Sequence, residues 1–139
     1  MHLKPYSASV LALAGWLLSG MGLYFIFLRP ALLPEDLAYM GSTWQNAQEH
    51  LPGLLIWLPK VFRVLGSYIF TTGLLTIFIA RTSFLSRTRG AFGMVAIAGI
   101  SSIGSMTVVN FLIDSDFKWV LLTFTMPWIM ALILYRLHK

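Results

Sequence analysis

Four polar residues of this sequence could together orient a polar ligand at the edge of a membrane: Arg63, Tyr68, Asn110 and Asp114. Arg63 and Asp114 supply opposite charges, and the other two can donate and accept hydrogen bonds. An ionisable side chain within an apolar stretch is costly, so it suggests a functional site by default. We therefore predict these four as ligand-binding residues. The structural alternative is that Arg63 extends to the interface or pairs with Asp114.

Other membrane chemistries lack the residues that they need. The chain has no cysteine, which excludes thiol redox chemistry and thiolate ligands. Its histidines, His2, His50 and His138, lie outside the apolar stretches, so haem between membrane helices is not expected. We predict no catalytic residue, no metal and no cofactor, and we favour a protein without catalytic chemistry of its own.

The composition is that of a membrane protein. Of 139 residues, 58% are hydrophobic and 11% are charged, whereas soluble domains carry about 25% charged residues. The net charge of +5 does not indicate nucleic acid, because the basic residues lie between apolar stretches and not along one polar face. Residues 1–139 are expected to form one integral membrane domain.

Four apolar stretches are long enough to cross the bilayer. A hydrocarbon core of about 30 Å requires about 20 helical residues, and a backbone inside lipid must satisfy its own hydrogen bonds, which favours helices. The sequence therefore predicts an all-α fold, a four-transmembrane-helix bundle. Its expected spans are approximately 9–28, 61–80, 91–113 and 117–135.

Small residues in the spans predict close packing in a compact, left-handed four-helix bundle. Helices in lipid associate through close backbone approach at such residues. They recur at spacings of three and four along one face of the first span, and two glycines lie on one face of the second. These positions are Ala8, Ala12, Gly15, Ser19 and Gly22, and then Gly66 and Gly73.

The distribution of charges predicts the orientation. One side of the membrane would hold six basic residues and no acid: Lys4, Arg81, Arg87, Arg89, Arg136 and Lys139. The other side would hold four basic residues and all five acids: Arg29, Lys60, Arg63 and Lys118 with Glu35, Asp36, Glu49, Asp114 and Asp116. Because basic loops stay inside, both termini are expected to be cytoplasmic, in a bacterial inner membrane.

The long loop between the first two spans is expected to form a helical extramembrane cap over residues 29–60. Pro34 suits the first position of a short helix, and the acids that follow it suit the positive end of the helix dipole. Gly41 would end this helix, and Ser42 or Thr43 would cap a second one. The segment LPGLLIWLPKVF is expected to return along the interface.

The second span also carries a family-like pattern, R-x-x-G-x(6)-G-L, formed by Arg63, Gly66, Gly73 and Leu74. In this pattern, in its size and in its four spans, the chain resembles the DoxX-like group of small bacterial membrane proteins. The resemblance implies a four-helix bundle and brings no catalytic residue with it.

Three functional hypotheses follow from the sequence. The first is an accessory subunit or interaction module, which contacts a membrane-protein partner or another copy of itself through Asp36, Trp44 and Trp57. The second is a protein or enzyme that binds a lipophilic ligand, such as a lipid, quinone or sterol-like molecule, under the outer cap. A small transporter is a weaker third, because no charged group lies near the middle of a span.

Overall fold

The structure is a computed structural model that describes residues 4–137, and within them it contains helices and no strands. It confirms the predicted all-α fold with four membrane-spanning helices. The elements are α1 (Lys4–Phe27), α2 (Pro34–Tyr39), α3 (Trp44–His50), α4 (Pro52–Ile79), the π-helix η1 (Ala80–Phe84), α5 (Ala91–Gly99), the π-helix η2 (Ile100–Gly104), α6 (Ser105–Leu112) and α7 (Lys118–Leu137).

The second membrane helix is longer than the sequence predicts. α4 begins at Pro52 and continues through η1, so that the apolar helix runs from Pro52 to Phe84 over 33 residues. Residues 52–60, which the sequence assigns to the cap, are therefore continuous with the helix of the second span, and their position at the membrane interface stays a prediction. Pro52 suits the start of the helix, because the backbone N–H that proline lacks would have no helical partner at the first position. Pro59, about two turns further on, lies inside the helix, where it removes one hydrogen bond.

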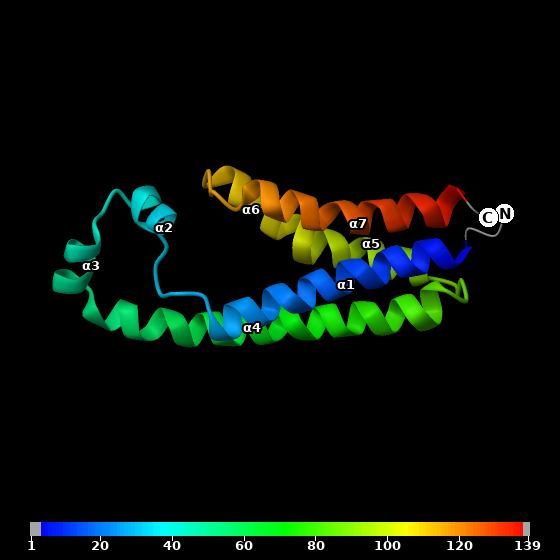
Figure 1. The fold of residues 1–139 in the computed structure, drawn as a ribbon, viewed down its shortest axis with the longest axis horizontal. Helices are drawn as coiled ribbons and strands as arrows, with labels where there is room; N and C mark the ends of the chain where they lie inside the picture. Colours follow the sequence, from blue (N-terminus) through cyan, green and yellow to red (C-terminus); the bar gives the residue numbers. More distant parts are fainter. Residues whose placement is uncertain (1–3, 138–139) are drawn as a thin grey trace.

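The four membrane helices form two pairs (Figure 1). α1 runs along α4, and α7 runs along the third span, which is built from α5, η2 and α6. α1 also packs against α7, which joins the two pairs. The pairs lie close together near the start of α1 and the end of α7, and they separate towards α2.

Small residues hold α1 close against α4. A Cβ added to Gly73 would lie 2.3 Å from Ser19 Oγ and 2.7 Å from the carbonyl oxygen of Gly15. A Cβ added to Gly22 would lie 2.4 Å from the backbone nitrogen of Phe70. The two backbones are thus in direct contact, and no larger side chain fits between them.

The third span joins α7 through polar contacts as well as apolar ones. Trp128 is 3% exposed and its indole N–H donates to the carbonyl of Val95 at 2.9 Å. Gly99 makes room for this ring, because a Cβ there would lie 2.3 Å from Trp128 Nε1. One turn nearer the α6–α7 turn, the hydroxyls of Thr107 and Thr125 lie 2.8 Å apart.

The cap contains the two short helices that the sequence predicts. α2 starts at Pro34 with both acids in its first turn and ends at Tyr39, and Gly41 follows in the left-handed conformation, with φ of +62°. Thr43 caps α3 by accepting the N–H of Asn46 at 3.3 Å. The cap lies beyond the end of α1, where α3 packs on α4 and α2 faces the α6–α7 turn (Figure 1).

Candidate functional site

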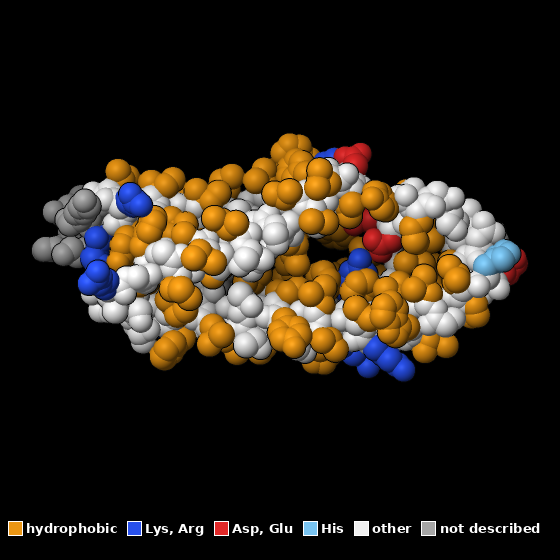
Figure 2. Space-filling model, turned by 180° about the vertical axis from the view of Figure 1, so that it is seen from behind, with side chains coloured by type: hydrophobic (Ala, Val, Ile, Leu, Met, Phe, Trp, Pro, Cys, Tyr) orange, Lys and Arg blue, Asp and Glu red, His pale blue; other side chains and the backbone are white. Residues whose placement is uncertain are grey.

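A largely apolar cavity of about 650 Å³ occupies the space where the two helix pairs separate. Its walls come from α1, α6 and α7, with side chains that include Trp16, Met21, Met106, Val109, Val120 and Phe124. One side is open, since Trp16 and Val109 are 56% and 51% exposed. Figure 2 shows an opening bordered by hydrophobic side chains, with acidic and basic side chains gathered at one end. In a membrane, this opening would face lipid.

Arg29, at the polar end of the cavity, is held by contacts on several sides. Its side chain is 11% exposed, and Nη2 lies 3.2 Å from Asp36 Oδ2. Nη1 donates to the carbonyl of Pro30 at 3.1 Å, and the guanidinium lies 3.7 Å from the centre of the Phe62 ring. The backbone N–H of Leu33 donates to the same Asp36 oxygen at 2.8 Å. These contacts fix the chain between α1 and α2 and keep a cation beside the cavity.

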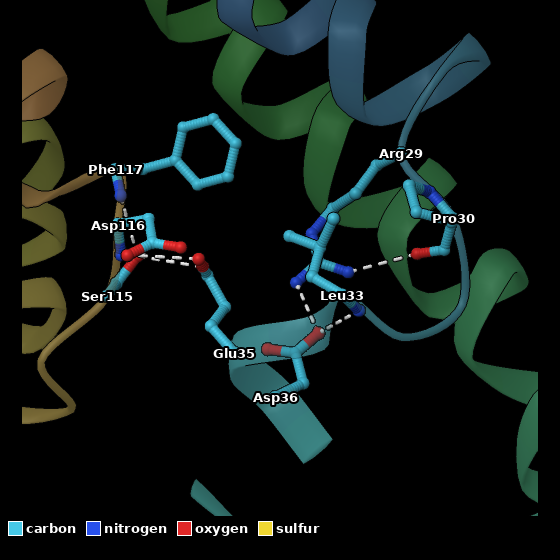
Figure 3. Close-up of polar contacts among 8 residues, drawn as sticks. All are labelled: Arg29, Pro30, Leu33, Glu35, Asp36, Ser115, Asp116 and Phe117. Atoms are coloured by element: carbon cyan, nitrogen blue, oxygen red, sulfur yellow. Dashed lines mark hydrogen bonds and ion pairs between the residues drawn. The ribbon is translucent and has the colours of Figure 1, made fainter. Parts of the chain in front are cut away.

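Glu35 connects the cap with the other helix pair (Figure 3). Ser115 Oγ donates to Glu35 Oε1 at 2.8 Å, and the N–H of Asp116 donates to Glu35 Oε2 at 3.2 Å. From α2, Glu35 thus reaches the α6–α7 turn on one side, while Asp36 reaches Arg29 on the other. α2 thereby closes the polar end of the cavity.

The α6–α7 turn presents Ser115 to Glu35 because of how α6 ends. Asp114 takes the left-handed conformation, with φ of +53°, which aspartate tolerates better than most residues. The N–H of Ser115 then donates to the carbonyl of Asn110 at 2.9 Å, and the N–H of Asp114 donates to that of Phe111 at 3.3 Å. These two bonds form a Schellman motif, which leaves Ser115 fully buried.

The structure does not bring the four predicted ligand-binding residues together. Asn110 lines the cavity. Arg63 and Tyr68 are exposed on α4, and they are not among the residues that line the cavity. Asp114 is 85% exposed and pairs with Lys118 on the next helix, so the alternative pairing of Arg63 with Asp114 is wrong. Their role in binding stays a prediction, and Asn110 has the most favourable position.

The pKa of the exposed Asp114 carboxyl is lowered by Lys118. The hydrogen bond from Lys118, and then its positive charge, lower the pKa of Asp114 below its ordinary value. Because the folded-state pKa is the lower one, the pair's contribution to stability is present above the ordinary aspartate pKa of about 3.9. It is lost as the pH falls through the lowered value.

Replacing Lys118 by methionine is expected to raise the pKa of Asp114 back towards that of an unpaired aspartate. The carboxyl carbon shift of Asp114, followed by NMR as a function of pH, measures this change directly. Asp116, which is also exposed on the same turn, serves as the internal control. An unchanged midpoint at Asp114 would mean that Lys118 does not pair with it.

The three predicted partner-contact residues differ in their surroundings. Trp44 and Trp57 are 44% and 57% exposed, so both present large apolar surfaces. Asp36 is partly buried, and its carboxylate is already engaged by Arg29 and by the N–H of Leu33. Contact with a partner through these residues stays a prediction, for which the two tryptophans are the better placed.

Arg29, Glu35 and Asp36 are charged residues of the cavity that the sequence does not predict as ligand-binding. The sequence places Arg29 at the membrane interface and the two acids in the first turn of a short helix. One available signal was their occurrence in a single loop, RPALLPED, in which an arginine precedes two acids across a proline-bracketed turn. Such an arrangement can fold back into an ion pair, although the contact with Ser115 lies too far along the sequence to be anticipated.

Comparisons of the chain with protein-family models, with curated proteins and with solved structures each found no match. The resemblance to the DoxX-like group therefore stays a prediction.

Proposed function

We propose that this multi-pass membrane protein binds one amphiphilic, lipid-like molecule in the cavity between α1, α6 and α7. The observation that carries the proposal is an apolar cavity of about 650 Å³ that is open at one side and has charged residues at one end. Ligand cavities of about 300–1,000 Å³ are typically apolar with a few polar groups that fix the orientation. An amphiphile matches both parts, with its hydrocarbon along the walls and its polar group near Arg29 and Glu35.

The orientation inferred from the charges places this polar group in the outer leaflet. The start of α1 and the end of α7 lie at the opposite end of the bundle from the cap (Figure 1). This end would be cytoplasmic, because the basic residues without acidic neighbours belong to it. The polar end of the cavity follows directly after α1, at the depth where lipid headgroups begin. We therefore propose an outer-leaflet ligand in a bacterial inner membrane.

Filling the cavity tests the proposal. Gly20 lines the cavity, and a Cβ added there would meet nothing within 4 Å. Gly20→Leu is therefore expected to leave the fold intact and to lower the occupancy of a bound lipid by about tenfold, which corresponds to 1.4 kcal/mol. Native mass spectrometry of the protein, extracted gently from its own membranes, measures the occupancy.

Gly93→Leu is the matched control, because Gly93 also has nothing within 4 Å and does not line the cavity. It should retain the lipid as the unmodified protein does. A protein that carries no discrete lipid, or a Gly20→Leu variant with full occupancy, would contradict the proposal.

The accessory role that the sequence favours remains a second proposal. The exposure of Trp44 and Trp57 on the cap and the start of α4 supports it. Replacing both by alanine should abolish co-purification of a stoichiometric partner or a defined homo-oligomer. Unchanged association would remove the support for it.

A further inference from the structure

The charges at the polar end of the cavity specify the ligand further. We infer that the ligand carries an ammonium group with N–H donors beside a phosphate, as an aminophospholipid such as phosphatidylethanolamine does. This inference rests on the proposed function, because it names the class of amphiphile that the same cavity would take. It is carried by the different hydrogen-bonding capacities of Glu35, Asn110 and Arg29, all of which line the cavity.

Glu35 and Asn110 supply acceptors. The Glu35 carboxylate accepts from Ser115 and from Asp116, and an ionised carboxylate has about four lone-pair sites, so it can accept further donors. Asn110 uses its Nδ2 group as a donor to the carbonyl of Met106 at 2.9 Å. Between residues 4 and 137 no hydrogen bond uses its amide oxygen, which leaves an acceptor for the ligand.

Ser115 connects the residues that carry these two acceptors, both of which line the cavity. The backbone carbonyl of Asn110 accepts the N–H of Ser115 at 2.9 Å, and the hydroxyl of the same Ser115 donates to Glu35 at 2.8 Å. A group with several N–H donors suits such a pair of acceptors. A primary ammonium provides three donors, whereas a quaternary ammonium provides none.

Arg29 supplies the complementary donors. Its two hydrogen bonds, to Asp36 and to the Pro30 carbonyl, use one donor each on Nη2 and Nη1. A guanidinium has five N–H donors in one plane, and this geometry suits phosphate. Phe62 covers a face of the guanidinium, which leaves the edge, where the donors lie, for an anionic oxygen.

The balance of charge disfavours an anionic lipid. The cavity is lined by the two carboxylates of Glu35 and Asp36 against the single guanidinium of Arg29, an excess of one negative charge. The ion pair with Asp36 already offsets Arg29, so Glu35 is the charge that needs a counterpart. A zwitterionic headgroup provides a cation for Glu35, and its phosphate can accept from the remaining N–H donors of Arg29. A lipid with only a phosphate would leave Glu35 without a cation and add a second uncompensated negative charge.

The experiment measures headgroup preference on the full-length protein. The delipidated protein in mild detergent is titrated, by native mass spectrometry, with phosphatidylethanolamine, phosphatidylcholine and phosphatidylglycerol of identical acyl chains. We expect phosphatidylethanolamine to bind most tightly. Glu35→Gln should lower its affinity about tenfold, the factor expected when one charge-assisted hydrogen bond is lost, and bring it to the level of phosphatidylcholine.

The substitutions separate charge from structure. A glutamine keeps one of the two acceptor oxygens, which can accept the N–H of Asp116, and its NH2 group can donate to the hydroxyl oxygen of Ser115. Glu35→Gln therefore removes the charge and can retain the contact of α2 with the α6–α7 turn. Glu49→Gln makes the same change at an exposed position on α3 that does not line the cavity, and it should not change the preference. A preference that is equal in Glu35→Gln and in the unmodified protein would overturn the role of Glu35.

The remaining outcomes distinguish the preference for one headgroup from lipid binding itself. Equal affinity for phosphatidylethanolamine and phosphatidylcholine would overturn the requirement for N–H donors, and tighter binding of phosphatidylglycerol would overturn the charge argument. In either case the binding of a lipid would stand. Failure of all three lipids to bind, with Gly20→Leu behaving as the unmodified protein does, would reject the proposed function itself.

Discussion

Replacing Gly73 by valine is expected to separate α1 from α4 and to prevent the protein from reaching its folded state. The added Cβ would lie 2.3 Å from Ser19 Oγ and 2.6 Å from the Ser19 backbone nitrogen. Overpacking of a core costs about 1–3 kcal/mol where side chains can adjust. The cost here is expected to exceed that range, because backbone atoms of α1 would have to move.

The measurement is the yield of monodisperse protein and its thermal unfolding temperature in one detergent. Gly93→Val is the control, since it places the same side chain in a membrane helix where nothing lies within 4 Å. It should match the unmodified protein in both respects. Normal folding of Gly73→Val would show that α1 and α4 do not approach as closely as the structure has them.

Replacing Arg29 by leucine is expected to release the cap. The variant leaves Asp36 without its cation, which is costly because that carboxylate is only 23% exposed. It also removes the stacking of the guanidinium on the Phe62 ring. Loss of one partner from a fully buried ion pair costs about 3–5 kcal/mol, which is an upper limit for this partly buried pair. We expect residues 29–51 to exchange their amide hydrogens faster, while the four membrane helices remain protected.

Hydrogen–deuterium exchange with mass spectrometry measures this release segment by segment. Arg63→Leu removes the same charge from an exposed position on α4 and should leave the exchange of the cap unchanged. The double variant Arg29→Leu/Asp36→Asn should recover part of the protection, because an asparagine oxygen can still accept the N–H of Leu33. Full protection in Arg29→Leu alone would contradict the anchoring role of this pair.

The sequence predicts the membrane helices well because lipid imposes simple rules on length, polarity and small residues. It also predicts α2, since Pro34 and Gly41 act locally on the backbone. It does not predict that the helix of the second span already begins at Pro52, with Pro59 accommodated inside it. The π-helical segments η1 and η2 have no local signal, since they depend on how the spans pack.

The candidate site was harder to predict because its contacts join distant parts of the chain. Asn110 was identified as a polar residue near a span end, and it lines the cavity. Arg63 attracts attention by its charge and lies within one turn of Gly66, which packs on α1, yet its own side chain is exposed. The contact of Glu35 with Ser115 depends on the angle between two helix pairs, which neither residue encodes locally.

The unequal lengths of α1 and α4 have a consequence for membranes of different thickness. At 1.5 Å per residue, the 33 residues from Pro52 to Phe84 span about 50 Å, and the 24 residues of α1 span about 36 Å. A hydrocarbon core of about 30 Å matches neither, and such hydrophobic mismatch is accommodated by tilt or by local thickening of the bilayer. Because glycine contacts bind α1 to α4, both helices must tilt together against α7. Bilayer thickness is therefore expected to widen or narrow the cavity, independently of which lipid headgroups are present.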